Sequence, residues 1–175
     1  YDYSKIKLNV YVTNLNKFSY ECYNHETHAD MKVLEAIYRS CSLPFIFQPE
    51  CCNNEWIVDG GLINPYPIQQ ALEVHKVEEI LGFKIKDEEL ACCPQDGSIF
   101  HFGYYVIMKL IRQNEKLNNH YDKNVKELII PATSMNVEDA KLLINNNSER
   151  ARIFELGKKY AKLFLTYQPS KEQNL

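Results

Sequence analysis

The chain has 175 residues, of which 45% are hydrophobic, and a formal net charge of −3. This length and composition are enough for one hydrophobic core. The acidic balance, with Lys and Arg scattered among Asp and Glu, supplies no basic surface and argues against nucleic-acid binding. No apolar run approaches the ~20 residues of a membrane-spanning helix, and the first residues lack the pattern of a signal peptide.

Alternating apolar residues over 6–12 predict a first strand, and Asn14–Lys17 predicts a turn. Residues 18–23 alternate in the same way and predict a short antiparallel partner. A helix is expected over 31–39, where apolar residues recur at helical spacing. We expect Thr27 or Asp30 to cap this helix and Leu43-Pro44 to end it, with its C-terminus directed toward the site described next.

The segment Trp56-Ile57-Val58-Asp59-Gly60-Gly61-Leu62-Ile63-Asn64-Pro65 is the most informative part of the sequence. Its apolar start predicts a strand that ends at Asp59. Strand ends are where α/β sheets place catalytic groups, and two glycines allow the backbone to turn sharply and to approach a substrate closely. An Asp-Gly pair also occurs as a plain turn whose side chain binds backbone amides, and that structural explanation of Asp59 stays open on these residues alone.

The remaining elements alternate between helices and strands, which indicates an αβα arrangement. Pro65 and Pro67 are expected to open a helix, and later helices are expected after Ser98, Ser134 and Ser148. The predicted helices and strands of this part are residues 65–72, 79–85, 98–117, 125–131, 140–144 and a last helix from 148 that includes residues 153–164.

Two adjacent blocks, residues 36–49 (AIYRSCSLPFIFQP) and 56–65, resemble patatin-like phospholipases in sequence and in order. The resemblance implies an α/β fold with a three-layer αβα sheet. It also implies a Ser-Asp dyad that cleaves acyl esters without a metal or other cofactor. Asp59 matches the aspartate of that dyad, and Gly60 and Gly61 match the glycines of its supporting turn.

The resemblance does not supply a nucleophile in this chain. The family carries its serine in a G-x-S-x-G motif, and none of the eight serines here has glycines two residues before and two after it. Residues 1–168 are therefore interpreted as the C-terminal part of a patatin-like domain that is incomplete at its N-terminus, with 169–175 as a disordered polar tail. The chain alone is predicted to be inactive. The alternative is a non-catalytic lipid- or protein-binding remnant.

The expected substrate of the complete protein is a phospholipid or a neutral lipid, and the surface of a membrane or a lipid droplet is a candidate place of action. Six cysteines, including the pairs Cys51-Cys52 and Cys92-Cys93, are interpreted as free thiols. A core of this size needs no disulfides, and neighbouring cysteines are poor disulfide partners. The consistent compartment is the cytoplasm, with peripheral attachment to membranes.

Two further groups of residues have chemistry of their own. Ser40 and Ser42 are possible nucleophiles by type, but they lie at a helix end without glycines, so residues 40–44 are expected to support the site. Cys22, His25 and His28 are residues of metal-ligand type, and Cys51-Cys52 could complete a metal site with them. Their spacing differs from that of common zinc sites, and a polar loop explains them better.

Overall fold

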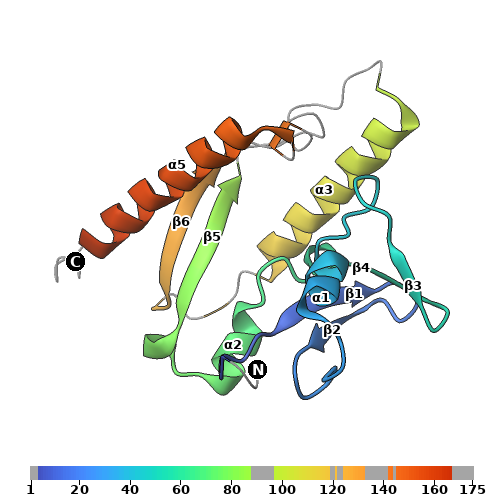
Figure 1. The fold of residues 1–175 in the computed structure, drawn as a ribbon, viewed down its shortest axis with the longest axis horizontal. Coiled ribbons are helices and arrows are strands. Elements are labelled where there is room, and N and C mark those ends of the chain that lie inside the picture. Colours follow the sequence, from blue (N-terminus) through green and yellow to red (C-terminus); the bar gives the residue numbers. More distant parts are fainter. Residues whose placement is uncertain are drawn as a thin grey trace. The chain divides into compact units, whose positions relative to one another are not determined.

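The computed structural model of the chain describes residues 4–87, 97–118, 121, 124–132, 142–143 and 145–166. Its helices and strands form a mixed α/β structure, which confirms the predicted class (Figure 1). The chain divides into two compact units, residues 1–73 with 91–121 and residues 74–90 with 122–175. Each unit is described by itself.

The first unit contains a four-stranded antiparallel sheet in the order β2-β1-β4-β3. Strands β1 (Val10–Asn14) and β2 (Ser19–Tyr23) form the predicted hairpin, and their connection is a turn, as expected. Strand β4 (Glu55–Asp59) lies on the other side of β1, and β3 (Glu50–Cys52) pairs with β4. The central strands β1 and β4 are thus joined although they lie far apart in the sequence.

Two of the strand predictions need correction. The first strand begins at Val10 rather than at residue 6. Val10 pairs with Tyr23, which is the last residue of β2, so β2 offers no partner to residues 6–9. Ile6 is left 71% exposed. Strand β3 was not predicted, since three residues are too short to show an alternating pattern.

Helix α1 (Val33–Ser40) covers one face of this sheet. A buried apolar cluster joins Ala36 of the helix to the strands and contains Val12, Tyr23, Ala36 and Ile57. The ion pair from Arg39 Nε to Glu50 Oε2, 2.7 Å long, ties the helix to β3 as well. The predicted caps are wrong: Lys32 is the N-cap and makes no side-chain cap bond, while the Thr27 hydroxyl donates to the carbonyl of Cys22.

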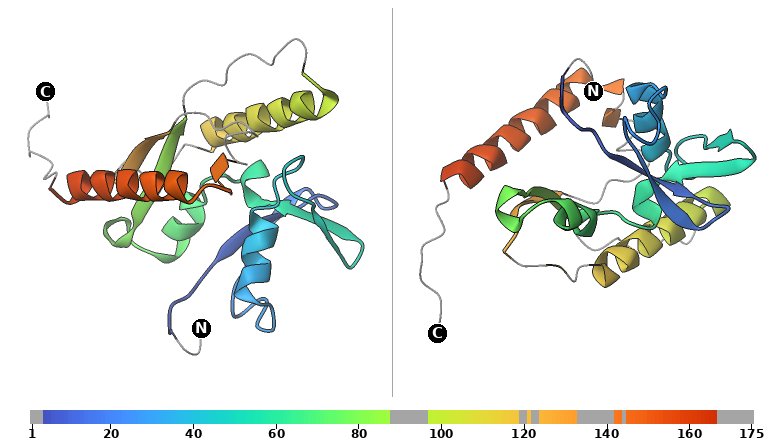
Figure 2. Two further views of the ribbon diagram at one scale, coloured as in Figure 1. Left: turned by 45° about the horizontal axis from the view of Figure 1, so that its top comes forward. Right: turned by 90° about the horizontal axis from the view of Figure 1, so that it is seen from below.

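The opposite face of the sheet meets helix α2 (Ile68–Val74), whose Gln70 donates to the Tyr20 hydroxyl at 3.1 Å. Because side chains alternate along a strand, Tyr20 points away from its neighbour Glu21, which lies on the face of α1. Figure 2 shows helix α3 (Ile99–Leu117) and α1 on opposite sides of these strands. This unit therefore has helices on both faces of its sheet.

Two helices of this unit were predicted with small errors or none. Helix α3 begins after Ser98, whose hydroxyl accepts the amide of His101, so the predicted cap is confirmed. Helix α2 begins at Ile68, three residues later than expected, after the second of the two prolines.

The second unit contains the parallel pair β5 (Leu81–Asp87) and β6 (Lys126–Ala132), preceded by the short helix η2 (Val77–Glu79). Helix α5 (Asn147–Thr166) contacts β6 and matches the predicted last helix. The helix expected over 140–144 and the tail 169–175 fall largely or wholly outside the described residues. No helix within the described ranges is long and apolar enough to cross a membrane.

Candidate active site

Asp59 is the last residue of β4, as the sequence predicted. It pairs with Val12 of β1, and its amide donates to the carbonyl of Ser42 at 3.2 Å. Val58, the preceding residue, is completely buried. The backbone of Asp59 is therefore fixed by the sheet on one side and by the segment after α1 on the other.

The carboxylate of Asp59 caps the short helix η1 (Gly60–Leu62), and its Oδ1 accepts the amide of Gly61 at 2.7 Å. Burial raises the pKa of this carboxyl above its ordinary value, and the bond from Gly61 opposes part of that rise. A carboxylate with a raised pKa is a stronger base than a solvated one, which suits proton transfer near neutral pH.

Gly60 is required because two backbone segments approach each other there. A Cβ at this position would lie 2.3 Å from the carbonyl oxygen of Tyr11 in β1, and that atom cannot move without disturbing the sheet. Neither Gly60 nor Gly61 has a positive φ. The turn after Asp59 therefore uses no backbone conformation that is special to glycine, and the expected close approach of this backbone to a substrate stays a prediction.

Helix α3 holds the segment that follows the two glycines. Asn114 donates from Nδ2 to the carbonyl of Leu62 at 2.6 Å, and Asn118 donates to the carbonyl of Ile63 at 3.2 Å. Sequence reasoning missed both residues. The two partners are 52 and 55 residues away, so only their shared face, four residues apart on one helix, was visible in the sequence.

The hydroxyls of Ser40 and Ser42 both donate to backbone carbonyls. The Ser40 hydroxyl donates to Tyr11 and the Ser42 hydroxyl to Tyr38, each at 2.7 Å. Ser42 is also completely buried. Between them lies Cys41, whose pKa is raised by burial and by the charge of Asp59. These contacts agree with a supporting role for the segment.

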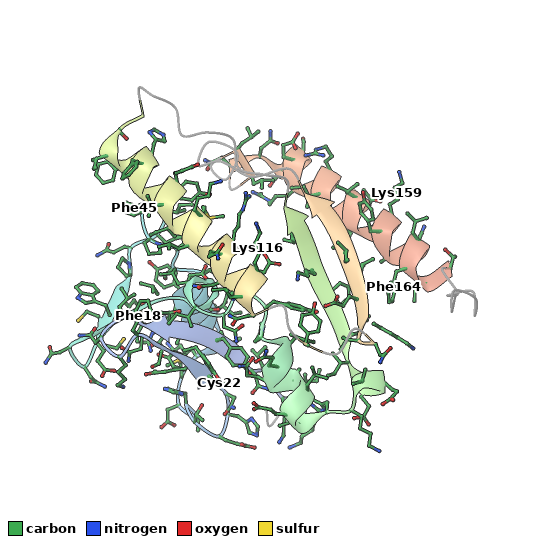
Figure 3. The ribbon with its side chains drawn as sticks, turned by 180° about the vertical axis from the view of Figure 1, so that it is seen from behind. Phe18, Cys22, Phe45, Lys116, Lys159 and Phe164 are labelled. Carbon is green, nitrogen blue, oxygen red and sulfur yellow. The ribbon has the colours of Figure 1, made fainter. Side chains whose placement is uncertain are left out.

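Phe45 continues this segment toward α3. Its ring lies so close to Gly103 of α3 that a Cβ there would come within 2.5 Å of it, and it meets the Phe100 ring edge to face at 6.3 Å. Phe45 adopts a left-handed φ of 71°, which a residue with a side chain takes only when its surroundings fix it. Figure 3 labels Phe45 beside α3 and Lys116 near the helix end.

The residues of metal-ligand type have other partners. The Tyr23 and His28 rings are in contact at a tilt of 41°, with centroids 4.1 Å apart, and Cys22 Sγ lies 3.8 Å from the Asn24 side-chain amide. Within the part of the chain that the structure describes, no three His, Cys, Asp or Glu side chains gather as a metal site would require. The described cysteines Cys22, Cys41, Cys51 and Cys52 are free thiols, and Cys92-Cys93 lies outside the described residues.

Comparison with known proteins shows what the first part of the chain is similar to. Residues 1–72 match the family model of patatin-like phospholipases, a range that contains the whole four-stranded sheet and Asp59. The chain is also 36% identical to a probable lipid hydrolase, 463L, of Invertebrate iridescent virus 6 over 62 residues. That match covers 35% of this chain and 21% of the relative, and no solved structure matches. Residues 1–72 are thus similar in sequence to patatin-like phospholipases, and the chain spans a minor part of the length of the viral relative.

Proposed function

We propose that the chain is part of a lipid acyl hydrolase in which Asp59 is the acid/base of a Ser-Asp dyad. The observation that carries this proposal is the carboxylate itself: it ends a central strand, its pKa is raised by burial, and a backbone amide holds one of its oxygens. It lies in the range that matches patatin-like phospholipases. With Oδ1 bound to Gly61, we assign Oδ2 to the serine.

The chemistry needs two proton transfers at this carboxylate. As the serine oxygen attacks the acyl carbonyl, its proton passes to Asp59, and a tetrahedral oxyanion forms. When that intermediate collapses, the ester C–O bond breaks and Asp59 returns the proton to the leaving alcohol. Water then attacks the acyl-enzyme and gives a proton to Asp59. Asp59 returns this proton to the serine oxygen as the acyl C–O bond breaks and the fatty acid leaves. The raised pKa of Asp59 favours both directions of transfer.

The serine and the oxyanion donors are assigned to parts of the protein outside these 175 residues, because no serine here has the flanking glycines of a nucleophile elbow. The proposal therefore expects no ester hydrolysis by the 175-residue chain alone. The match to 21% of the length of the viral relative is compatible with a chain that represents one part of such an enzyme.

The proposed substrates are phospholipids or neutral lipids, hydrolysed at a membrane or lipid-droplet surface on the cytoplasmic side. What supports this class is the patatin-like match and the description of the viral relative as a lipid hydrolase.

Asp59→Asn in the full-length protein tests the proposal. The amide keeps an oxygen for the Gly61 bond but cannot take up the serine proton, so we expect turnover of a phospholipid or ester substrate to fall by about 10²–10⁴-fold. The matched control is Asp30→Asn, the same change at an exposed position. If Asp59→Asn folds and hydrolyses as well as the control, Asp59 has no catalytic role and the proposed dyad is wrong.

A further inference from the structure

The turn that carries Asp59 is held from outside by two asparagines of α3. Asn114 lies in the last turn of α3, and Asn118, four residues later, is the C-cap of that helix; they donate to the consecutive carbonyls of Leu62 and Ile63. Residues four apart lie on the same face of a helix, so one face of α3 holds the end of η1.

Helix η1 has little stability of its own. It comprises three residues, and such short 3-10 segments have poorer hydrogen-bond geometry than an α-helix. Within it, the amides of Ile63 and Asn64 both return to the carbonyl of Gly60, at 3.3 and 3.0 Å. The carbonyls at its C-terminal end need partners from elsewhere, and Asn114 supplies one at the short distance of 2.6 Å.

The same small turn contains the amide that binds the carboxylate. Gly61 lies between Asp59, whose Oδ1 it binds, and Leu62, whose carbonyl Asn114 binds. Because Leu62 is bonded directly to Gly61, a shift of Leu62 is expected to displace the Gly61 N–H or to rotate it away from the Asp59 carboxylate.

We propose that Asn114, assisted by Asn118, is a positioning residue for Asp59: the two amides anchor the turn after β4 and so keep the Gly61 N–H on the Asp59 carboxylate. The catalytic consequence rests on the function proposed above, whereas the structural coupling does not. Asn114 touches neither the substrate nor the reacting atoms in this mechanism and acts only through the turn.

Measurement of the Asp59 carboxyl by NMR tests this coupling in the 175-residue chain without any need for activity. The variant is Asn114→Leu, which keeps the size of the side chain and removes the donor. The matched control is Gln113→Leu, the same replacement of an amide at the neighbouring, exposed position of α3. Carboxyl titration gives the pKa of Asp59, and hydrogen exchange follows the Gly61 amide.

In Asn114→Leu we expect a higher Asp59 pKa than in the control, because the Gly61 bond that stabilises the charged form is weakened. We also expect roughly tenfold faster exchange of the Gly61 amide, the scale of one lost hydrogen bond. Asn118→Leu, at an exposed position with a longer bond, should shift both quantities in the same direction by less. If Asn114→Leu does not fold, the Asp59 pKa and the Gly61 exchange rate of Asn118→Leu test the proposal instead.

An Asp59 pKa and a Gly61 exchange rate that match the control in a folded variant would overturn the proposal. In the full-length protein, the expected result is a lower kcat with an unchanged KM, and a pH profile displaced upward with the Asp59 pKa. If the NMR shifts occur and Asp59→Asn nonetheless leaves hydrolysis intact, the positioning holds and the catalytic role of Asp59 fails.

Discussion

At the scale of single residues, Asp59 is balanced between two opposing effects. Burial disfavours its charge, while one backbone N–H favours it. Burial is the larger effect, so the folded state holds a proton on this carboxyl more strongly than the unfolded state does. A group that is destabilising when charged and yet present in the structure fits a functional rather than a stabilising role.

This balance predicts a pH-dependent effect of Asp59→Asn on stability. Because the folded pKa is raised, wild-type stability falls as pH rises from the unfolded carboxyl value through the folded value. The asparagine does not titrate. The unfolding free energy of the Asp59→Asn variant minus that of wild type should therefore increase across that pH interval and stay constant above it. Urea denaturation at a series of pH values measures the difference. A difference that stays constant with pH would contradict the raised pKa.

Gly60→Ala should destabilise the sheet, because the added methyl meets the backbone carbonyl of Tyr11 at 2.3 Å. Overpacking of this kind costs about 1–3 kcal/mol. The control is Gly157→Ala in α5, where a Cβ would meet nothing within 4 Å, and alanine should stabilise that helix by up to about 1 kcal/mol. Circular dichroism follows both variants during denaturation. Equal effects of the two substitutions would contradict the close approach at Gly60.

At the scale of elements, the β1–β2 hairpin depends on one buried amide. Asn14 is completely buried, donates to Glu21 at 2.8 Å and to Glu55 at 2.6 Å, and accepts the amides of Asn16 and Lys17. It thereby joins β2, β4 and the turn at a single point. The turn predicted from sequence is thus stabilised by a side chain at its first position.

Asn14→Leu should therefore destabilise the first unit by about 2–4 kcal/mol, because several hydrogen bonds are lost and their partners remain partly buried. Lys17→Gln is the comparison, since Lys17 bridges the same two carboxylates from an exposed position. It should cost less than Asn14→Leu, as exposed ion pairs contribute little. Fluorescence of Trp56, the single tryptophan, reports on the sheet during urea denaturation. A larger loss for Lys17→Gln would show that the ion pairs, and not the amide, hold the hairpin.

How much was predictable from sequence follows from the range of each interaction. Residues 18–23 show an alternating pattern, residues 56–58 form a short apolar run, and Ser98 stands directly before its helix, so these elements were predicted from local sequence. The start of β1 depends on where β2 ends, and the role of Asn114 depends on a carbonyl 52 residues away. Asp59 was found because its strand and both glycines are contiguous, while the reason for Gly60 appears only when β1 lies beside it.

At the scale of the whole molecule, the family match and the four-stranded sheet coincide. The matched residues 1–72 contain β1 to β4, α1 and most of α2, and lie in the first compact unit. The second unit, with β5, β6 and α5, lies outside the match. The assignment of residues 1–168 to one patatin-like domain stays a prediction, as do the three-layer sheet of the whole domain and the cytoplasmic location.

The most direct test of the central claim is to label the full-length protein with a fluorophosphonate and to map the modified residue by mass spectrometry. Such a reagent reacts with a serine only when an adjacent group activates it. The account predicts labelling of one serine outside these 175 residues, at a rate that falls strongly in Asp59→Asn. Labelling of Ser40 or Ser42, or a rate that does not depend on Asp59, would contradict it.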